Sequence, residues 1–519
     1  MILNESEWSD KTSYLTDVVI VGAGAAGISL ALELERKKIN VILLEGGKDL
    51  FDEESQDCYR GKVTARDLPY GLYSSRLRFF GGSTNCWAGG CGELDKEDFI
   101  YRPWIKNSGW PFAKTELISW YNKAAVFLGL DIDRIRNPEK LKNMPPFHGF
   151  NTRILEFTKK VRFKHEFRQD LEKSKSIKVF FGANLHTVNR MSDTDSVESI
   201  QVVSFNGKKV VLFGNAYILA CGGIENARLL LNTEKKGRKA IGNAFDNLGR
   251  FFSDHPIAPC ATVIGVSGKL TDFFLNSRKF IENKKGGRST PFYRMPYELQ
   301  KKYKTLNVSI QFATQEEELG AGEISAWKIK RLLSKSEYSS IKAKDIKNVV
   351  FNLSSIVNSI YDRSVNSGRV ALRFQIEQLP AKNNRITLSG ERDSVGLRRT
   401  KLHWEFSELE RHSLNVVIAY TAKCLQSANI GTLKLDSQLI DDPLDLPMDL
   451  RGGQHHSGTT RMSLARETGV VDENLKVFDS ENLYILGSSV FPTNGWVNPT
   501  FTIIALSFRL ANHLKVTRF

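Results

Sequence analysis

The pattern of apolar and polar positions is most regular over residues 17–45. Residues 17–21 form a short, β-branched apolar run, which is typical of a buried parallel strand, and residues 40–44 form a second one. Between them, residues 28–37 have the spacing of an amphipathic helix. The pattern predicts a strand, a glycine-rich turn, a helix and a second strand, which is the order of a nucleotide-binding unit.

Three glycines and one acidic residue occupy the positions that such a unit uses for binding. Gly22 permits the tight turn, Gly24 lets a pyrophosphate approach the backbone, and Gly27 lets the helix pack close to the strand. The helix N-terminus offers free N–H groups to the phosphates. Glu45 ends the second strand, where a carboxylate accepts hydrogen bonds from ribose hydroxyls and repels a 2′-phosphate. These residues leave both FAD and NAD open.

Two later stretches also combine glycines with apolar residues. Residues 76–92, RLRFFGGSTNCWAGGCG, are too rich in glycine for a helix or a central strand and predict a tight loop. Residues 177–220 alternate as short strands, with a hairpin signal at Asn206 and Gly207. A buried strand at 216–220 then runs through glycines into a helix expected at 226–232. This second strand–glycine–helix crossing also suits a dinucleotide.

The middle of the chain, from about residue 256 to 440, lacks these glycine motifs. Three runs in it have the pattern of strands, of which the last two should pair antiparallel: 370–379, 384–389 and 401–406. Ser407 is expected to cap a helix that ends near residue 427, with Glu410 completing the capping box. We interpret this region as a separate sheet domain that is inserted into the nucleotide-binding domain.

The end of the chain again combines buried strands with glycine-rich motifs, as residues 17–45 do. Residues 482–486 predict a buried strand that leads into Gly487, and a final helix is expected over 501–514, so the chain should return to the first sheet. Near the other end, Thr115 is expected to cap a helix that ends near residue 128. The fold class is therefore α/β, with a discontinuous Rossmann-like domain and an α+β substrate domain whose sheet is mainly antiparallel. The expected boundaries are 1–255, 256–440 and 441–519.

Composition and charge change this picture little. The 519 residues are enough for two domains, and 41% hydrophobic and 25% charged residues are ordinary for a folded protein. The net charge of +15 leaves an acidic partner open, including peripheral contact with a membrane, although solvated surface charge is the simpler explanation. No nucleic-acid-binding module accompanies the charge, so no nucleic-acid partner is expected. The lysine-rich stretches are 235–239, 284–288, 301–304 and 328–346.

Six cysteines without a CxxC pair favour reduced thiols over a disulfide framework. The first residues are polar with early acids, unlike a signal peptide, and no run of ~20 apolar residues suggests a membrane span. These observations predict a cytoplasmic protein.

At this point the motifs resemble, in the same order, those of the glucose–methanol–choline (GMC) flavin oxidoreductases. The matching stretches are GAGAAG with Glu45, RFFGGSTNCWAGG, ILACGGIENARLLL, NLGRFFSDHP, HHSGTTRM and NLYILGSSVFPTNGWVNPTFTIIAL. They lie between residues 17 and 511, whereas the expected substrate domain matches only through EQLPAKNNRITLS at 377–389. The length and the RPWIKNSGWP segment look most like the short bacterial branch that acts on sugar, glycoside or aminoglycoside hydroxyls.

The resemblance implies FAD as the cofactor and a set of residues that contact it. Cys86 stands roughly where some members carry a histidine that binds the flavin covalently, so non-covalent FAD is expected, with a cysteinyl link as the exception. The implied FAD-binding residues are Gly22, Gly24, Ala25, Gly27, Glu45, Gly81, Gly82, Ser83, Asn85, Cys86, Trp87, Ala88, Leu185, Ala220, Gly222, Gly487, Ser488, Asn498, Pro499 and Thr500.

Alcohol oxidation needs a base for the hydroxyl proton, and imidazole has a suitable pKa. His455 has the family's spacing for that base, while Asn498 matches the place of a residue that orients the substrate oxygen. His456 should point the other way along an extended segment, and His255 is expected to be structural. Glu377 is expected either to orient a group in the site or to pair with Arg385 or another basic residue. No metal site is expected.

We therefore expect an enzyme that oxidises a CH–OH group of a small polar alcohol, with hydride transfer to flavin N5 and reoxidation by oxygen or another acceptor. Two alternatives remain open. One is a lyase on the same scaffold, in which FAD undergoes no net redox chemistry. The other is a non-catalytic flavoprotein associated with a membrane or a complex.

Overall fold

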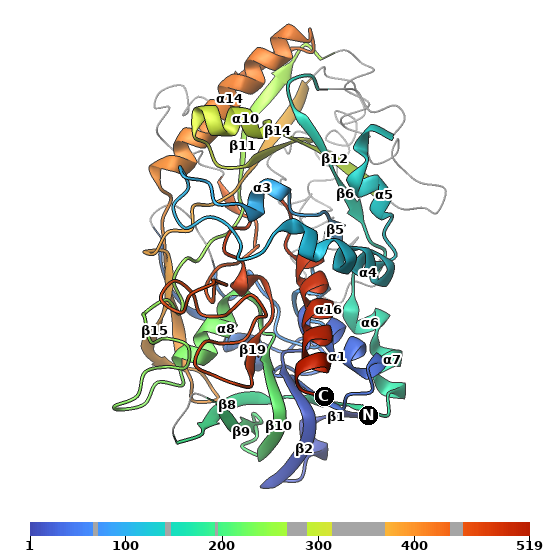
Figure 1. The fold of residues 1–519 in the computed structure, drawn as a ribbon, viewed down its shortest axis with the longest axis vertical. Helices are drawn as coiled ribbons and strands as arrows, with labels where there is room; N and C mark the ends of the chain where they lie inside the picture. Colours follow the sequence, from blue (N-terminus) through green and yellow to red (C-terminus); the bar gives the residue numbers. More distant parts are fainter. Residues whose placement is uncertain (66–70, 141–146, 193–195, 267–287, 314–368, 436–449) are drawn as a thin grey trace, which may run out of the picture.

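The computed structural model describes residues 1–65, 71–140, 147–192, 196–266, 288–313, 369–435 and 450–519. The lysine-rich stretch 328–346 and most of the stretch 284–288 lie outside these residues. Figure 1 shows two sheets stacked along the long axis of the molecule, with β2, β10 and α1 towards one end and β11, β14 and α14 towards the other.

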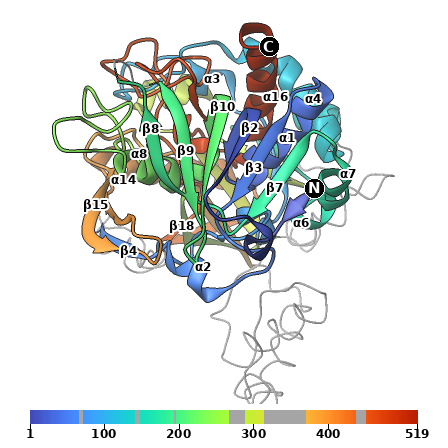
Figure 2. The same cartoon turned by 90° about the horizontal axis from the view of Figure 1, so that it is seen from below.

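The predicted nucleotide-binding unit lies at the centre of the first sheet. Strand β2 (Thr12–Val21), helix α1 (Ala25–Arg36) and strand β3 (Val41–Glu45) follow each other as expected. The described strands are ordered β1-β7-β3-β2-β10-β9-β8, and Figure 2 shows this order from β7 to β8. Strand β19 pairs in parallel with the end of β10 (Figure 1). The remaining bounds are β1 Ile2–Leu3, β7 Ile177–Phe181, β8 Asn184–Arg190, β9 Val197–Val203, β10 Lys209–Leu219 and β19 Leu483–Ile485.

The connections of this sheet follow from local signals in the sequence. The hairpin predicted at Asn206 and Gly207 joins β9 to β10 antiparallel, and Gly207 has a φ of +83° as such a turn requires. The predicted return of the chain is confirmed, because β19 pairs with β10. Helix α16 (Thr500–Thr517) then packs on α1 and on α4 (Ile118–Leu128), on one face of the sheet.

Two predicted helix starts are wrong. Thr115 is not an N-cap, because Ala113 precedes a 3₁₀ turn, η3 (Lys114–Leu117), which leads directly into α4. The helix expected at 226–232 starts earlier, as α8 (Gly222–Leu231), and its first residue, Gly222, has a φ of +84°. Both errors concern a first turn, where the backbone N–H groups need no intrahelical partner and sequence signals are weakest.

The second sheet is antiparallel throughout its described strands, in the order β17-β11-β14-β13-β12-β6-β5, with β18 beside β11. Its face is covered by α14 (Glu408–Ser427), which has the predicted Ser407 cap and Glu410 capping box. The strand bounds are β5 Gly90–Cys91, β6 Asn151–Phe157, β11 Pro256–Ile264, β12 Arg288–Arg294, β13 Val308–Ala313, β14 Arg369–Ile376, β17 Thr432–Leu435 and β18 Arg451–Gly452. Strands β5, β6 and β18 of this sheet come from outside residues 256–440. The proposed domain boundaries stay a prediction.

The antiparallel pair predicted after residue 384 is present as β15 (Arg385–Arg392) and β16 (Arg398–Trp404). It forms a three-stranded sheet with β4 (Gly61–Ala65) beside α8, separate from the second sheet. Shorter elements complete the chain: η1 Glu5–Glu7, α2 Glu53–Asp57, η2 Gly82–Asn85, α3 Lys96–Phe99, α5 Ile132–Arg136, η4 Pro138–Lys140, α6 Phe163–Glu166, α7 Arg168–Lys173, α10 Tyr297–Tyr303 and η5 Ser488–Val490.

The arrangement is the predicted α/β fold, with a Rossmann-like sheet completed by the C-terminal part of the chain and a second, antiparallel sheet. Among the described helices, none has both the length and the apolar character that crossing a bilayer requires.

Candidate active site

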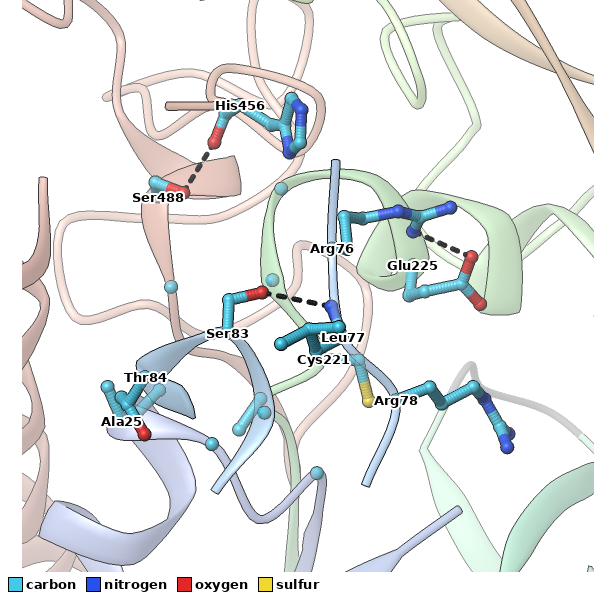
Figure 3. Close-up of a pocket in the computed structure, with 18 of the residues that line it drawn as sticks. Ala25, Arg76, Leu77, Arg78, Ser83, Thr84, Cys221, Glu225, His456 and Ser488 are labelled. Carbon is cyan, nitrogen blue, oxygen red and sulfur yellow. Dashed lines mark hydrogen bonds and ion pairs between the residues drawn. The ribbon is translucent and has the colours of Figure 1, made fainter. Parts of the chain in front are cut away.

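A cavity of about 420 Å³ lies where the strands β2, β3, β10 and β19 of the first sheet end. This is the edge at which nucleotides bind in open α/β sheets. Most residues that the sequence nominated line it, although they come from segments far apart in the chain, such as those of Ala25, Ser83 and Ser488 (Figure 3). They are Gly22, Gly24, Ala25, Glu45, Gly82, Ser83, Cys86, Trp87, Ala88, Leu185, Ala220, Gly222, His455, Gly487, Ser488, Asn498, Pro499 and Thr500.

The two glycine turns face each other across one end of this cavity. A Cβ on Gly22 would lie 2.7 Å from the Ala220 carbonyl oxygen, so the turns can approach this closely only with glycine there. In contrast, a Cβ on Gly24 or Gly222 would meet no described atom within 4 Å. These two positions leave open space at the cavity wall, which fits the close approach of a pyrophosphate.

Gly27 does not line the cavity. A Cβ there would lie 1.9 Å from the Gly22 carbonyl oxygen, in agreement with the predicted role of this glycine in packing α1 against β2. The contact with the pyrophosphate that the resemblance implied for Gly27 stays a prediction.

Glu45 lines the cavity, and its carboxylate is held by backbone groups. Its carboxylate accepts hydrogen bonds from Ala23 N (3.2 Å) and Gly47 N (2.8 Å). Burial raises the pKa of Glu45, and these bonds together with the charge of Arg78 oppose the increase. Arg78 in turn donates through Nη2 to Asn184 Oδ1 at 2.6 Å. A carboxylate with two oxygens turned to donors in this way is suited to ribose hydroxyls.

The glycine-rich loop forms a second wall. Two residues of this loop do not line the cavity: Gly81, with a φ of +90°, and Asn85, which donates to Phe80 O. Trp87 does line it, and its buried Nε1–H has no acceptor among the described residues. A buried donor without a partner costs free energy unless a ligand accepts from it. Together with the open glycine positions, this donor shows that the residues fit a bound dinucleotide.

A cluster of charged side chains that lines the cavity was not predicted. Arg76 stacks on Tyr59 at 3.9 Å and donates to Glu225 Oε1 at 3.0 Å, and Arg228 donates to the other oxygen of Glu225 at 3.0 Å. Figure 3 shows Arg76 and Arg78 on the same short segment of the chain beside the cavity. The sequence signal was present, since Arg76 and Arg78 alternate directly before the glycine-rich loop, but such spacing alone does not distinguish phosphate neutralisation from structural ion pairs.

His455 and Asn498 also line the cavity. The His455 backbone N–H donates to Asp254 Oδ1 at 2.6 Å, which fixes the main chain there. Burial lowers the pKa of His455 to about 3, with a smaller contribution from the neighbouring His456. The imidazole is therefore neutral at physiological pH and has a free lone pair, but a pKa this low makes it a weaker base than the ordinary imidazole that the sequence suggested. Asn498 makes a long contact from Nδ2 to Gly90 O, at 3.4 Å.

The structure also shows the contacts of His456, His255 and Glu377, for which the sequence suggested roles other than that of the base. The ring of His456 stacks on Phe252, while that of His255 contacts the ring of His455. His255, expected to be structural, is thus in direct contact with the predicted base. Glu377 pairs with Arg102, and both side chains are fully buried; Arg385 pairs with Asp246 instead.

The remaining chemical expectations concern metal and cysteine. No group of three or more His, Cys, Asp and Glu side chains in the described part of the chain is placed to hold a metal ion. All six cysteines lie within the described residues and are free thiols. Cys86 is exposed at the cavity, with its Sγ 3.3 Å from Ser83 O.

Two family models match the chain: an FAD dependent oxidoreductase model over residues 17–154 and a GMC oxidoreductase model over residues 380–507. A solved structure, pyridoxine 4-oxidase from Mesorbium loti, superposes with a TM-score of 0.57 at 15% identity, covering 97% of this chain and 100% of that one. At this identity the likeness concerns the fold.

Three curated proteins have similar sequences. A 2-methyl-1,2-propanediol dehydrogenase of Mycolicibacterium austroafricanum is 29% identical over 27% of this chain and 24% of its own length. A C-glycoside 3-oxidase of Microbacterium trichothecenolyticum is 28% identical over 27% of this chain and 26% of its own length. The chain thus matches only about a quarter of these two relatives. The fructose dehydrogenase large subunit of Gluconobacter japonicus is 21% identical over 96% of this chain and 97% of its own length.

Proposed function

The chain belongs to the GMC oxidoreductases, with FAD as its cofactor, and from this premise we propose that it oxidises a CH–OH group of a polar hydroxyl compound. The observation that carries the proposal is one continuous cavity. Its lining includes the two glycine turns and Glu45 together with His455 and Asn498. A proton acceptor and an amide donor are thus placed beside the space for a dinucleotide.

In this proposal the two polar residues have separate roles. His455, neutral because of burial, accepts the hydroxyl proton. Asn498 cannot take that proton; its amide orients the substrate oxygen and stabilises the negative charge that develops on it. When bound, FAD supplies the two-electron acceptor that oxidation of the CH–OH group requires. The proposed FAD contacts are the cavity-lining residues named above, without a covalent link.

We propose a sugar, a glycoside or an aminoglycoside as the substrate. The names of two relatives, a C-glycoside 3-oxidase and a fructose dehydrogenase large subunit, support a carbohydrate, whereas that of the third supports a smaller diol. The test panel therefore includes both classes.

The test is anaerobic flavin reduction. The purified FAD-loaded protein is mixed with sugars, glycosides, aminoglycosides and simple diols, and the visible flavin absorbance is followed. Loss of the absorbance with one class supports the proposal and names that class. In His455→Ala the reduction rate should fall about 10²- to 10⁴-fold, as expected when a general base is removed. His165→Ala, an exposed histidine outside the cavity, is the matched control and should reduce at the wild-type rate.

Two other outcomes contradict the proposal. A yellow protein that stays oxidised with every alcohol favours the lyase alternative, in which FAD has no net redox role. A protein that remains colourless after addition of FAD removes the basis of the proposal. Equal reduction rates for wild type and His455→Ala overturn the assignment of the base.

The electron acceptor and the location complete the proposal. We propose a cytoplasmic enzyme, which the six free thiols support. Admitting oxygen or an artificial acceptor to the substrate-reduced protein compares the two routes of reoxidation, because an oxidase regains its absorbance with oxygen alone. Sedimentation with anionic vesicles at low and high salt tests peripheral membrane contact.

A further inference from the structure

The ring of His255 lies between a backbone carbonyl and the proposed base. Its Nε2 is 2.8 Å from Gly495 O, and its Nδ1 is 2.9 Å from Nδ1 of His455. The side chain is fully buried. Both ring nitrogens of His255 are therefore engaged within one hydrogen-bonded row, which begins at Gly495 and ends at His455.

The chemistry of this row determines where its protons are. A carbonyl oxygen only accepts, so Nε2 of His255 must carry the proton that it donates to Gly495 O. In a neutral imidazole the other nitrogen, Nδ1, then has the lone pair. It accepts from His455, whose proton must therefore be on Nδ1. This leaves the lone pair of His455 on Nε2, and no described residue donates a hydrogen bond to that atom.

This arrangement of protons exists only when both rings are neutral, and their surroundings favour the neutral forms. Burial lowers the pKa of His255 to about 4, and the neighbouring His455 lowers it further. The groups that oppose this are Asp254, Glu377 and the Gly495 carbonyl. A doubly protonated His255 would donate to Nδ1 of His455 instead and place the proton of His455 on Nε2. His455 could not then act as a base.

The main chain around the two rings is held by Asp254. Its Oδ1 accepts from the backbone N–H of His255 (2.7 Å) and of His455 (2.6 Å), and its Oδ2 accepts from that of Gln454 (3.1 Å). The Asp254 carbonyl accepts from Asn494 Nδ2 at 2.9 Å, next to Gly495. One carboxylate thus positions both histidines, so the Nδ1–Nδ1 contact is set by the backbone.

We infer that His255 is a positioning residue that holds His455 in the tautomer with its lone pair on Nε2. The inference rests on the proposed function. When the substrate O–H bond breaks and an Nε2–H bond forms on His455, the resulting cation keeps donating through Nδ1 to His255. That bond becomes charge-assisted, which stabilises the protonated base. The hydrogen and the electron pair of the C–H bond go to the FAD of the proposed function.

The test uses two amides that reproduce different nitrogens of the imidazole. In His255→Asn the amide oxygen takes the place of Nδ1 and still accepts from His455. In His255→Gln the amide nitrogen takes the place of Nε2 and still donates to Gly495 O, but no acceptor faces His455. We expect kcat to fall about a hundredfold or more in His255→Gln and in His255→Leu. His255→Asn should recover most of that loss.

A spectroscopic readout separates this role from simple packing. Imidazole ¹⁵N chemical shifts distinguish the two neutral tautomers, and His455 is assigned by comparison with His455→Ala in the FAD-loaded, oxidised protein. Wild type and His255→Asn should show the proton on Nδ1 of His455. His255→Gln should show a mixture or the other tautomer. FAD absorbance and thermal unfolding establish that each variant is folded and loaded.

Several results overturn the inference. A wild-type spectrum with the proton on Nε2 of His455 does so without any variant. Equal kcat in His255→Gln and His255→Asn does so as well, because it assigns His255 to support of Gly495 alone. If no alcohol reduces the wild-type flavin, the proposed function fails, while the tautomer measurement still decides the assignment of the row.

Discussion

Among single residues, His455 combines a partly buried position in the cavity with a role that requires it to gain a proton. A histidine in water has a pKa of about 6.5 and loses its capacity as a base below that pH. In this cavity burial lowers the pKa of His455 to about 3, so the neutral ring persists well into acid solution. In the cavity, water does not solvate the protonated ring of His455 fully. The hydrogen bond with His255 then supplies part of the missing stabilisation.

This yields a prediction about pH. The value of kcat/KM should be independent of His455 protonation from pH 8 down to about pH 5, because the folded protein keeps the ring neutral throughout that range. An ordinary histidine base would instead halve kcat/KM near pH 6.5. The measurement is kcat/KM against pH with the substrate that reduces the flavin, alongside flavin fluorescence to monitor FAD release. An acid limb with a midpoint near pH 6.5 contradicts the assignment.

Sequence motifs predicted His455 and Asn498 but not the role of His255. The motif residues lie in short, glycine-rich stretches whose spacing is itself the signal. The contact of His255 with His455 joins residues 200 positions apart, through a bridge in which Ser253 pairs with Ser457. No periodicity in either stretch specifies such a crossing of two irregular segments, so only the folded backbone shows it.

Among the elements, the turn between β2 and α1 offers a matched pair of glycines for mutation. Gly24→Ala adds a Cβ to open space at a φ of −92°, so the backbone tolerates it. The stability of the FAD-free protein should change by less than about 0.5 kcal/mol. The new methyl group occupies the cavity wall, so FAD affinity should fall by at least about tenfold, or about 1.4 kcal/mol.

Gly27→Ala should behave in the opposite way. Its Cβ would lie 1.9 Å from the Gly22 carbonyl oxygen, which forces α1 away from β2. The FAD-free protein should lose about 1–3 kcal/mol, the usual cost of overpacking. Urea unfolding without FAD and titration with FAD measure the two effects separately. If both variants lose stability equally, the assignment of Gly24 to the cofactor and Gly27 to packing is wrong.

The elements of the first sheet were predicted better than those of the second for a physical reason. Buried parallel strands such as β3, which is buried at every position, leave a continuous apolar run that the sequence displays directly. The two runs at 384–389 and 401–406, which bracket a turn, predicted that β15 and β16 pair antiparallel. They did not show that β16 pairs on its other side with β4, more than 300 residues earlier, because backbone hydrogen bonds carry little sequence information.

In the whole molecule, a buried ion pair joins the segment after α3 to the second sheet. Arg102 Nη1 donates to Glu377 Oε2 at 2.8 Å, and both side chains are fully buried. Glu377 also accepts from Asn307 N at 2.9 Å. The sequence presented Glu377 as a possible partner of Arg385, because the two are close in sequence, whereas the fold brings Arg102 from 275 positions away.

Removing one charge of this pair should cost far more than removing both. Arg102→Met leaves Glu377 buried without its cation and should lower the free energy of unfolding by about 3–5 kcal/mol. The double variant with Glu377→Met should recover a large part of this loss. Arg385→Met, which breaks the more exposed pair with Asp246, is the control and should cost no more than about 1 kcal/mol. Urea unfolding of the FAD-saturated proteins gives the comparison; additive effects in the double variant would show that the two charges are not coupled.

Close to this ion pair, helix α3 carries an acidic residue whose titration should affect the stability of the whole molecule. Asp98 is fully buried, where its Oδ2 accepts from Asp95 N at 2.8 Å. Burial, followed by the charges of Asp95 and Glu377, raises the pKa of Asp98 to about 7. In the unfolded chain its pKa is about 3.9. Between these values the folded protein keeps a proton that the unfolded chain releases, so the contribution of Asp98 to stability falls as pH rises from about 4 to about 7 and is constant above that.

Asp98→Asn removes this titration and isolates its effect. The buried histidines, whose pKa values are lowered, act in the opposite direction over an overlapping range, but they are common to both proteins and cancel in the difference. Relative to wild type, Asp98→Asn should therefore gain stability steadily from pH 5 to pH 7, and the difference should level off above pH 7. Thermal unfolding midpoints of both proteins across that range measure it. A difference that does not change with pH would mean that Asp98 is already ionised in the folded protein.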